Sequence, residues 1–302
     1  MQPTPPAPDL RMRALAMRLF GISCFAIMMV LIKLASDRGV RVPELMFWRQ
    51  ATAVPIVLAW VIAGPGIASL KTKRIGLHLT RSAMGLTAMA RTFSAIMLLP
   101  LAEQTTLGFA VPIFATILSA LFLKEAVGRH RWGAVVIGFI GVIIVVQPGG
   151  SHIPLIGAAV GLGSAFAVAI TSLQIRSMGR TEAATTTVFW FSLIAAVPLA
   201  VLLPFFITPH DTTEWILMIA IGVLGGIGQI GITAALRLAP VSTVIVMDYS
   251  ALIWSTLFGW LIWSHIPGPA TWIGAAVIIL SSGYIAIREH RLHIQSVREI
   301  SA

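Results

Sequence analysis

The sequence predicts an all-α membrane protein whose ten transmembrane helices form two inverted repeats of five helices each, with both termini in the cytoplasm. Of its 302 residues, 57% are hydrophobic and only 11% are charged, whereas about a quarter are charged in a soluble domain. This composition excludes a soluble enzyme and a disordered chain. The net charge of +10 does not indicate a nucleic-acid partner, because the basic residues punctuate apolar runs instead of forming a basic face.

Ten segments of the chain are apolar over the roughly 20 residues that a helix needs to cross a bilayer. The first segment is expected to be a retained helix and not a signal peptide, because many further apolar runs follow it. The connecting segments are too short to hold an extramembrane domain. The predicted spans are about 14–35, 43–64, 78–99, 102–123, 130–147, 153–175, 183–206, 214–237, 240–262 and 269–287.

The distribution of basic residues predicts the orientation of these spans. With the N-terminus in the cytoplasm, fifteen Lys and Arg fall in cytoplasmic segments, and two, Arg38 and Arg41, fall in outer loops. Cytoplasmic loops carry such an excess, and an even number of spans then places both termini in the cytoplasm. The expected organisation is a disordered tail over 1–13, a first repeat over 14–149, a second repeat over 150–288 and a cytoplasmic tail over 289–302.

The two halves of the chain share residues at an offset of 140. Matching pairs include Pro100 and Pro240, Gly128 and Gly268, and Trp132 and Trp272. Because each repeat contains an odd number of spans, the second copy must lie inverted relative to the first. Inverted repeats are typical of secondary transporters, which alternate around a site near the middle of the membrane.

Two segments carry a resemblance to a known family: LPLAEQTTLGFAVPIFATIL over 99–118 and LFLKEAVGRHRWGAVVIGFIGVIIVVQPG over 121–149. With the ten spans and the repeat, they resemble the EamA domain of the drug/metabolite transporter superfamily over nearly the whole chain. The resemblance implies transport of a small metabolite in the inner membrane of a bacterium. It also implies that the fifth and tenth spans are peripheral and that the other eight surround a cavity. It does not imply a substrate.

Ionisable residues inside the spans are candidates for the substrate site, because burying a charge in a membrane is costly. Asp248 is the only acidic residue deep in a predicted span, and it could bind a substrate ammonium or a proton. A buried carboxylate that is neutral or bonded to a neighbouring helix is the alternative. Arg49 and Arg91 could bind a carboxylate or a phosphate, for which a guanidinium is suited. Arg81 is expected to anchor the cytoplasmic interface.

Aromatic and polar residues on other spans complete the candidate site. Thr105 and Phe109 share one face of the fourth span, and Phe109 matches Tyr249 at the offset of 140. Trp190 could stack on an aromatic or cationic substrate. Close helix packing remains the alternative for these residues. The predicted substrate-binding residues are Asp248, Tyr249, Phe109, Trp190, Arg49, Arg91, Gln229 and Thr105.

The sequence contains no Walker loop, so ATP-driven transport is not expected. It also contains no His-Glu-x-x-His motif and no cysteine cluster, so no catalysis, metal or cofactor is expected. The predicted function is alternating-access export of a small metabolite, an amino acid or a related amphipathic compound. Its expected partners are that small molecule and the lipid bilayer, without nucleic acid, and the chain acts as a monomer or homodimer. A lipid flippase and a lipid-modifying membrane enzyme remain alternatives.

Overall fold

The structure is a computed structural model that describes residues 8–122, 128–147, 153–179, 181–238 and 244–301. Within these ranges the chain forms helices and no strand. The helices are α1 (Pro8–Asp37), α2 (Val42–Ala63), η1 (Ile67–Leu70), α3 (Ile75–Leu98), α4 (Leu101–Gly108), α5 (Val111–Phe122), α6 (Arg129–Val146), α7 (Leu155–Met178), α8 (Ala184–Phe206), α9 (Thr212–Leu238), η2 (Ile245–Tyr249), α11 (Ser250–Trp263) and α12 (Pro269–Ser301).

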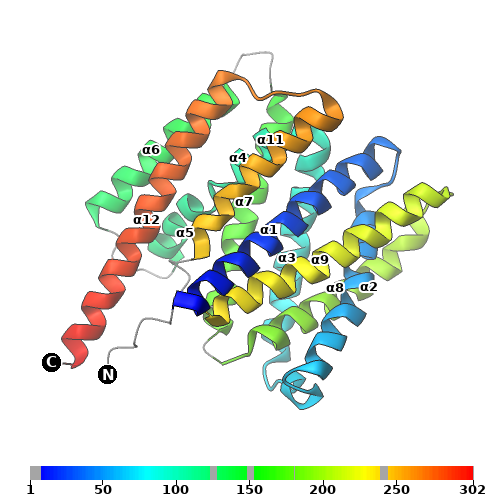
Figure 1. The fold of residues 1–302 in the computed structure, drawn as a ribbon, viewed down its shortest axis with the longest axis horizontal. Coiled ribbons are helices and arrows are strands. Elements are labelled where there is room, and N and C mark those ends of the chain that lie inside the picture. The colour runs from blue at the N-terminus through cyan, green and yellow to red at the C-terminus, as the bar shows by residue number, and fades with distance from the viewer. Residues whose placement is uncertain (1–7, 123–127, 148–152, 180, 239–243, 302) are drawn as a thin grey trace.

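Long helices packed side by side build the molecule (Figure 1). Helix α1 packs along α9, α3 packs along α7, and α2 contacts both α8 and α9. Helices α6 and α12 lie against each other at one edge. Gly21 of α1 allows the close contact with α9, because a Cβ at that position would stand 2.8 Å from the backbone oxygen of Gly228.

Eight helical segments of the described residues, with α4 and α5 counted together as Leu101–Phe122, are long and apolar enough to cross a membrane. Helix α3 and the segment formed by η2 and α11 lie where the third and ninth spans are expected, but they do not meet the same criteria. Helix α3 carries His78, Arg81 and Arg91, and α11 has only 14 residues. Large apolar side chains such as Val136 and Ile140 of α6 and Val201 of α8 are exposed, as expected of a surface that faces lipid.

The terminal helices extend beyond the predicted spans. Helix α1 already begins at Pro8, inside the segment 1–13 that was expected to be a disordered tail, while residues 1–7 lie outside the described residues. Proline is favourable in the first turn of a helix, where its missing N–H is not needed. Helix α12 continues to Ser301, through the expected cytoplasmic tail.

The fourth predicted span is not one continuous helix, and the ninth has a matching irregularity. Helix α4 ends at Gly108 and α5 begins at Val111, because Pro112 cannot donate the backbone hydrogen bond that would join them. In the second half, the short η2 ends at Tyr249, and α11 begins at Ser250. The Ser250 hydroxyl donates to the Met247 oxygen at 2.6 Å, a local bond that competes with regular helix. The two irregularities lie about 140 residues apart.

Candidate functional site

A cavity of about 390 Å³ lies where α1, α4, α7, α9, η2 and α11 meet. Its lining is mostly apolar and includes Phe25 and Met29 of α1 and Ile232 of α9. Three polar residues, Arg18, Asp248 and Ser255, also line it. An apolar cavity with a few placed polar groups is the usual form of a small-molecule site.

Arg18 and Asp248 form a two-point ion pair at this cavity. The Nε of Arg18 donates to Oδ1 of Asp248 at 2.7 Å, and Nη2 donates to Oδ2 at 2.6 Å. The side chains are 13% and 34% exposed, so the Arg18 guanidinium is mostly removed from water, whereas the Asp248 carboxylate keeps partial access to it. Two parallel bonds from a guanidinium to a carboxylate combine charge attraction with fixed geometry.

Arg18 is a site residue that sequence reasoning missed. It counts among the cytoplasmic basic residues in the predicted topology, because it lies only four residues after the start of the first predicted span. A signal was available: Ile22, Phe25 and Met29 follow Arg18 at helical spacing, and all line the cavity with it. Because α1 starts at Pro8, Arg18 lies almost three turns inside the helix.

Phe109 and Tyr249, the aromatic pair predicted at the repeat offset, contact each other. Their ring centroids are 5.4 Å apart at an interplanar angle of 74°. Phe109 follows the end of α4, Tyr249 ends η2, and the Ser282 hydroxyl of α12 donates to the Phe109 oxygen at 3.1 Å. The contact therefore joins the two irregular segments directly, beside Asp248. Neither ring is among the residues that line the cavity.

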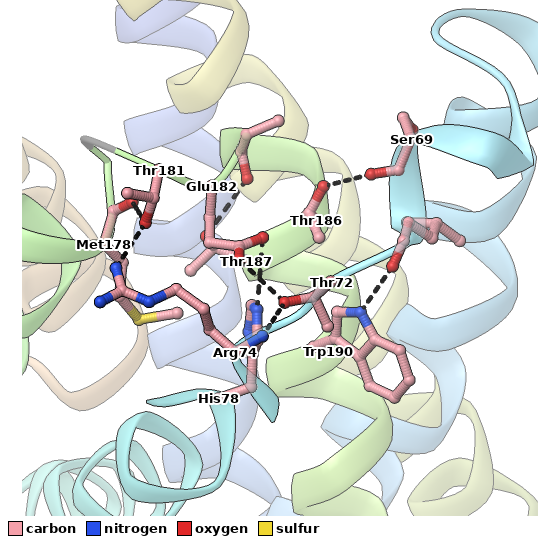
Figure 2. Close-up of polar contacts among 12 residues, drawn as sticks. Ser69, Thr72, Arg74, His78, Met178, Thr181, Glu182, Thr186, Thr187 and Trp190 are labelled. Atoms are coloured by element: carbon pink, nitrogen blue, oxygen red, sulfur yellow. Dashed lines mark hydrogen bonds and ion pairs between the residues drawn. The ribbon is translucent and has the colours of Figure 1, made fainter. Parts of the chain in front are cut away.

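Trp190 lies at a junction between α8 and the segment that connects α2 to α3, as Figure 2 shows. Its Nε1 donates to the Leu70 oxygen at 2.9 Å, and the Thr186 hydroxyl donates to the Ser69 oxygen at 2.7 Å. These bonds hold η1 against α8, so the structure gives Trp190 an anchoring contact outside the cavity. Further bonds at this junction join Thr72 to Glu182 and Arg74 to Thr181.

The other four predicted site residues also lie outside the cavity lining. Arg49 of α2 donates to Oε1 of Gln50 and approaches the sulfur of Met89 on α3. Arg91 is exposed, and its guanidinium lies over Gly163 of α7. The remaining two are Thr105, which is buried in α4, and Gln229, which is half-buried in α9. The structure thus places Arg18 beside Asp248, and neither Arg49 nor Arg91.

Polar contacts also join helix ends away from the cavity. The Lys33 ammonium donates to the backbone oxygens of Ile96 and Leu99, both at 3.0 Å, and Trp263 donates to Asp37 at 2.9 Å. These contacts bring the end of α1 to the ends of α3 and α11. Each of them joins segments that the predicted topology places on the same side of the membrane.

His210 connects α2 to the segment before α9. Its ring nitrogens lie 2.5 Å from Glu44 and 2.8 Å from Glu214. Burial opposes a charge on this ring, but the hydrogen bonds that the ring makes to Glu214 and Glu44 outweigh the effect of burial and raise the pKa of His210. Across the described ranges, no group of three or more His, Cys, Asp or Glu side chains could hold a metal ion.

Comparison with known proteins agrees with this architecture. The sequence profile of the EamA-like transporter family matches twice, over residues 12–147 and 155–287. A riboflavin transporter of Vibrio cholerae is 31% identical over 239 residues, which cover 78% of this chain and 80% of that protein. A pseudopaline exporter of Pseudomonas aeruginosa is 28% identical over 274 residues, covering 90% and 95%.

Two further matches have lower sequence identity to this chain. Solute carrier family 35 member G1 of Mus musculus is 26% identical over 83% of this chain and 72% of its own. A solved crystal structure has the same fold with a TM-score of 0.60 at 21% identity, covering 90% of this chain and 96% of the other.

The family profile covers most of the chain in two copies, and the relatives are named as transporters, not as enzymes. Together with the eight candidate membrane helices, they make this chain a multi-pass protein of the bacterial inner membrane, whose partners are a small-molecule substrate and the lipid bilayer. The chain belongs to the EamA-like transporter family.

Proposed function

We propose that the protein exports a small amphipathic metabolite, an amino acid or a related compound, by alternating access, and that the cavity at Arg18 and Asp248 is its substrate site. The observation that carries the proposal is the two-point ion pair at an apolar cavity. A zwitterion presents a carboxylate and an ammonium, which can replace the two partners of this pair while its apolar part occupies the cavity.

Exchange of partners gives the transport step a physical basis. In the structure the ion pair ties α1 to η2. A substrate that takes over both charges removes this tie without leaving either charge unpaired. It therefore favours a conformation in which α1 and η2 separate, and a ligand shifts a conformational balance by such a difference in affinity.

The ten-span inverted arrangement with cytoplasmic termini is part of the same proposal. The helix sequence from α1 to α6 is matched by that from α7 to α12 at a spacing close to 140 residues, and the family profile likewise matches twice. The packing follows this correspondence, because the pair α1 and α9 is equivalent to the pair α7 and α3. Discontinuous helices near the centre of inverted repeats are where transporters place their substrates.

The names of the relatives support a small organic substrate. The Vibrio cholerae relative is named for riboflavin and the Pseudomonas aeruginosa relative for pseudopaline export. The second name also favours the outward direction that the sequence predicts.

A ligand-stabilisation screen tests this proposal. Purified protein is heated with amino acids, nucleosides, vitamins and organic cations, since a ligand that binds the folded state raises the melting temperature by mass action. One chemical class is expected to stabilise the wild type and the exposed control Asp211→Asn, but not Asp248→Asn. Equal stabilisation of Asp248→Asn would reject the cavity as the site, and stabilisation by lipids alone would favour a flippase.

A further inference from the structure

Two arginines on α2 and α3, the half-buried Arg49 and the buried Arg81, are not used by the proposed cavity. Arg81 is 8% exposed, and its guanidinium carbon lies 4.3 Å from the ring centroid of Phe191 on α8. It was expected to anchor the cytoplasmic interface, but the structure turns it into the protein. Arg49 extends from α2 between Met89 of α3 and Gly225 of α9.

Several donors of these two arginines and of Gln50 lack acceptors. Buried N–H groups without any hydrogen-bond partner include Nε of Arg49, Nε and Nη1 of Arg81, and Nε2 of Gln50, whose side chain is fully buried. Neither guanidinium forms an ion pair within the described residues. The positive charge of Arg49 also acts unfavourably on Arg81. Glu182, a buried carboxylate near this end of α3, is occupied by Thr72 and His78.

Such an arrangement is costly in an empty protein, because buried charges persist when they are paired and hydrogen-bonded. Arg49, Arg81 and Gln50 all lack the same thing, a negatively charged acceptor with several oxygen atoms. A carboxylate or phosphate supplies it, since its oxygens accept parallel bonds from guanidinium groups. An aromatic ring beneath one guanidinium leaves the edge donors of that group free for such a ligand.

The position of Arg49 connects this cluster to the cavity. Gly225, which contacts Arg49, and Ile232, which lines the cavity, are seven residues apart on α9 and so lie on one face, about 10 Å apart. Met28 of α1 also approaches Gly225, and its neighbour Met29 lines the cavity. Arg49 and the cavity therefore lie beside the same helix, α9, about two turns apart.

We propose that Arg49, Arg81 and Gln50 form an oxyanion site that takes an acidic group of the transported compound. The site itself stands on its own contacts, whereas the assignment to the transported compound rests on the proposed function of the cavity. The substrate class then becomes an amphipathic metabolite with an acidic group in addition to the groups that Arg18 and Asp248 bind.

The first test uses inorganic phosphate as the probe on the full-length purified protein. Its melting temperature is measured against phosphate concentration at constant ionic strength. A saturable rise is expected for the wild type and for Arg38→Gln, a matched arginine whose side chain is 47% exposed. Arg49→Gln and Arg81→Gln should weaken phosphate binding by roughly tenfold or more, as expected when a charge-assisted bond is lost. No saturable rise in the wild type, or an undiminished one in both Gln variants, overturns the site.

A second readout separates a ligand site from a structural role of the arginines. Without phosphate, Arg81→Gln should melt at or above the wild-type temperature, because it removes an unpaired buried charge. Arg81→Lys keeps the charge without the fork of donors and should retain part of the phosphate effect. A large fall in the melting temperature of Arg81→Gln, with phosphate binding intact, would mean that Arg81 only supports the fold.

Serine, aspartate and phosphoserine, which share a zwitterionic end, test whether the anion at this site is an acidic group of the transported compound. Greater stabilisation by the two acidic compounds, lost in Arg81→Gln, supports an acidic substrate. Equal effects of all three, beside a response to phosphate, overturn that assignment. Phosphate binding by the Asp248→Asn variant distinguishes the two proposals. This variant should still bind phosphate at the arginine site, whether or not the cavity is the substrate site.

Discussion

At the scale of single residues, the central feature is the ion pair between Arg18 and Asp248. Asp248 was expected to bind a substrate ammonium or a proton, or to be bonded to a neighbouring helix, and in the structure Arg18 of α1 binds it. The pair lies at an apolar cavity, so the removal of one partner leaves the other charge without compensation. The ion pair therefore matters to both stability and transport, and the two roles can be separated by exchanging the charges.

The exchange Arg18→Asp with Asp248→Arg is expected to restore stability but not transport. Each single substitution places like charges together and should lower the melting temperature, whereas the double variant restores an attractive pair. Transport should remain lost, because the carboxylate and guanidinium now stand in each other's places for the substrate. Melting curves and liposome flux measure the two effects, and full flux in the double variant would contradict the account.

His210 should make stability depend on pH. Its pKa is raised above the ordinary value of 6.5, so its charge stabilises the folded state fully below pH 6.5, and this contribution is lost as the pH rises through the raised value. The groups that face it are Glu44 and Glu214. The melting temperature of the wild type should exceed that of His210→Gln most at about pH 6 and approach it toward pH 9. A difference that grows with pH would show that the sign is wrong.

At the scale of helices, two features shape the site: the close packing of α1 against α9 and the two irregular helix segments. Gly21 lets α1 approach α9, which places Arg18 and Phe25 along the cavity. The irregular segments at Phe109 and Tyr249 meet through their rings. The sequence predicted the correspondence of these two aromatic residues through the repeat offset, but their contact required the packing of α4 against α11.

Gly21→Ala is expected to destabilise the protein by about 1–3 kcal/mol, because the added Cβ would stand 2.8 Å from the Gly228 oxygen. Gly133→Ala in α6 is the matched control. Beyond its chain neighbours and the nearby backbone of its own helix, no atom lies within 4 Å of the added Cβ, so a change below about 1 kcal/mol, in the stabilising direction, is expected there. Thermal unfolding compares the two variants, and equal effects would argue against a close α1–α9 contact.

Tyr249→Phe should keep transport, whereas Tyr249→Ala and Phe109→Ala should reduce it severalfold. The ring of Tyr249 contacts Phe109, and this contact joins the two irregular segments. Flux measured in liposomes for the three variants tests whether the ring contact is needed for transport. A loss in Tyr249→Phe as large as in Tyr249→Ala would assign the role to the hydroxyl group.

At the scale of the whole molecule, the composition was enough to predict a helical membrane protein, and the offset of 140 was enough to predict two matching halves. The burial of Arg81 was not predictable in the same way, because the positive-inside rule treats it as an interface residue. The anchoring contact of Trp190 depends on η1 folding against α8, which is a tertiary event. Arg18 was missed because it was counted with the cytoplasmic basic residues at the start of the first span.

The proposed topology is tested by cysteine labelling of intact cells. After Cys24, the one cysteine of the sequence, is replaced by Ala, single cysteines are introduced by Asp211→Cys and Lys71→Cys. A membrane-impermeant maleimide should label the first variant from outside and the second only after lysis. The reverse pattern would invert the orientation, and labelling of both from outside would reject the arrangement of the spans.

The most direct test of the central claim is counterflow in liposomes, using the compound that gives the largest stabilisation of the wild type. Wild-type protein should exchange the labelled compound across the membrane, and Asp248→Asn should lose this exchange although it remains folded. The control Asp211→Asn should keep it. Wild-type exchange rates in folded Asp248→Asn would contradict the assignment of the Arg18–Asp248 cavity as the substrate site.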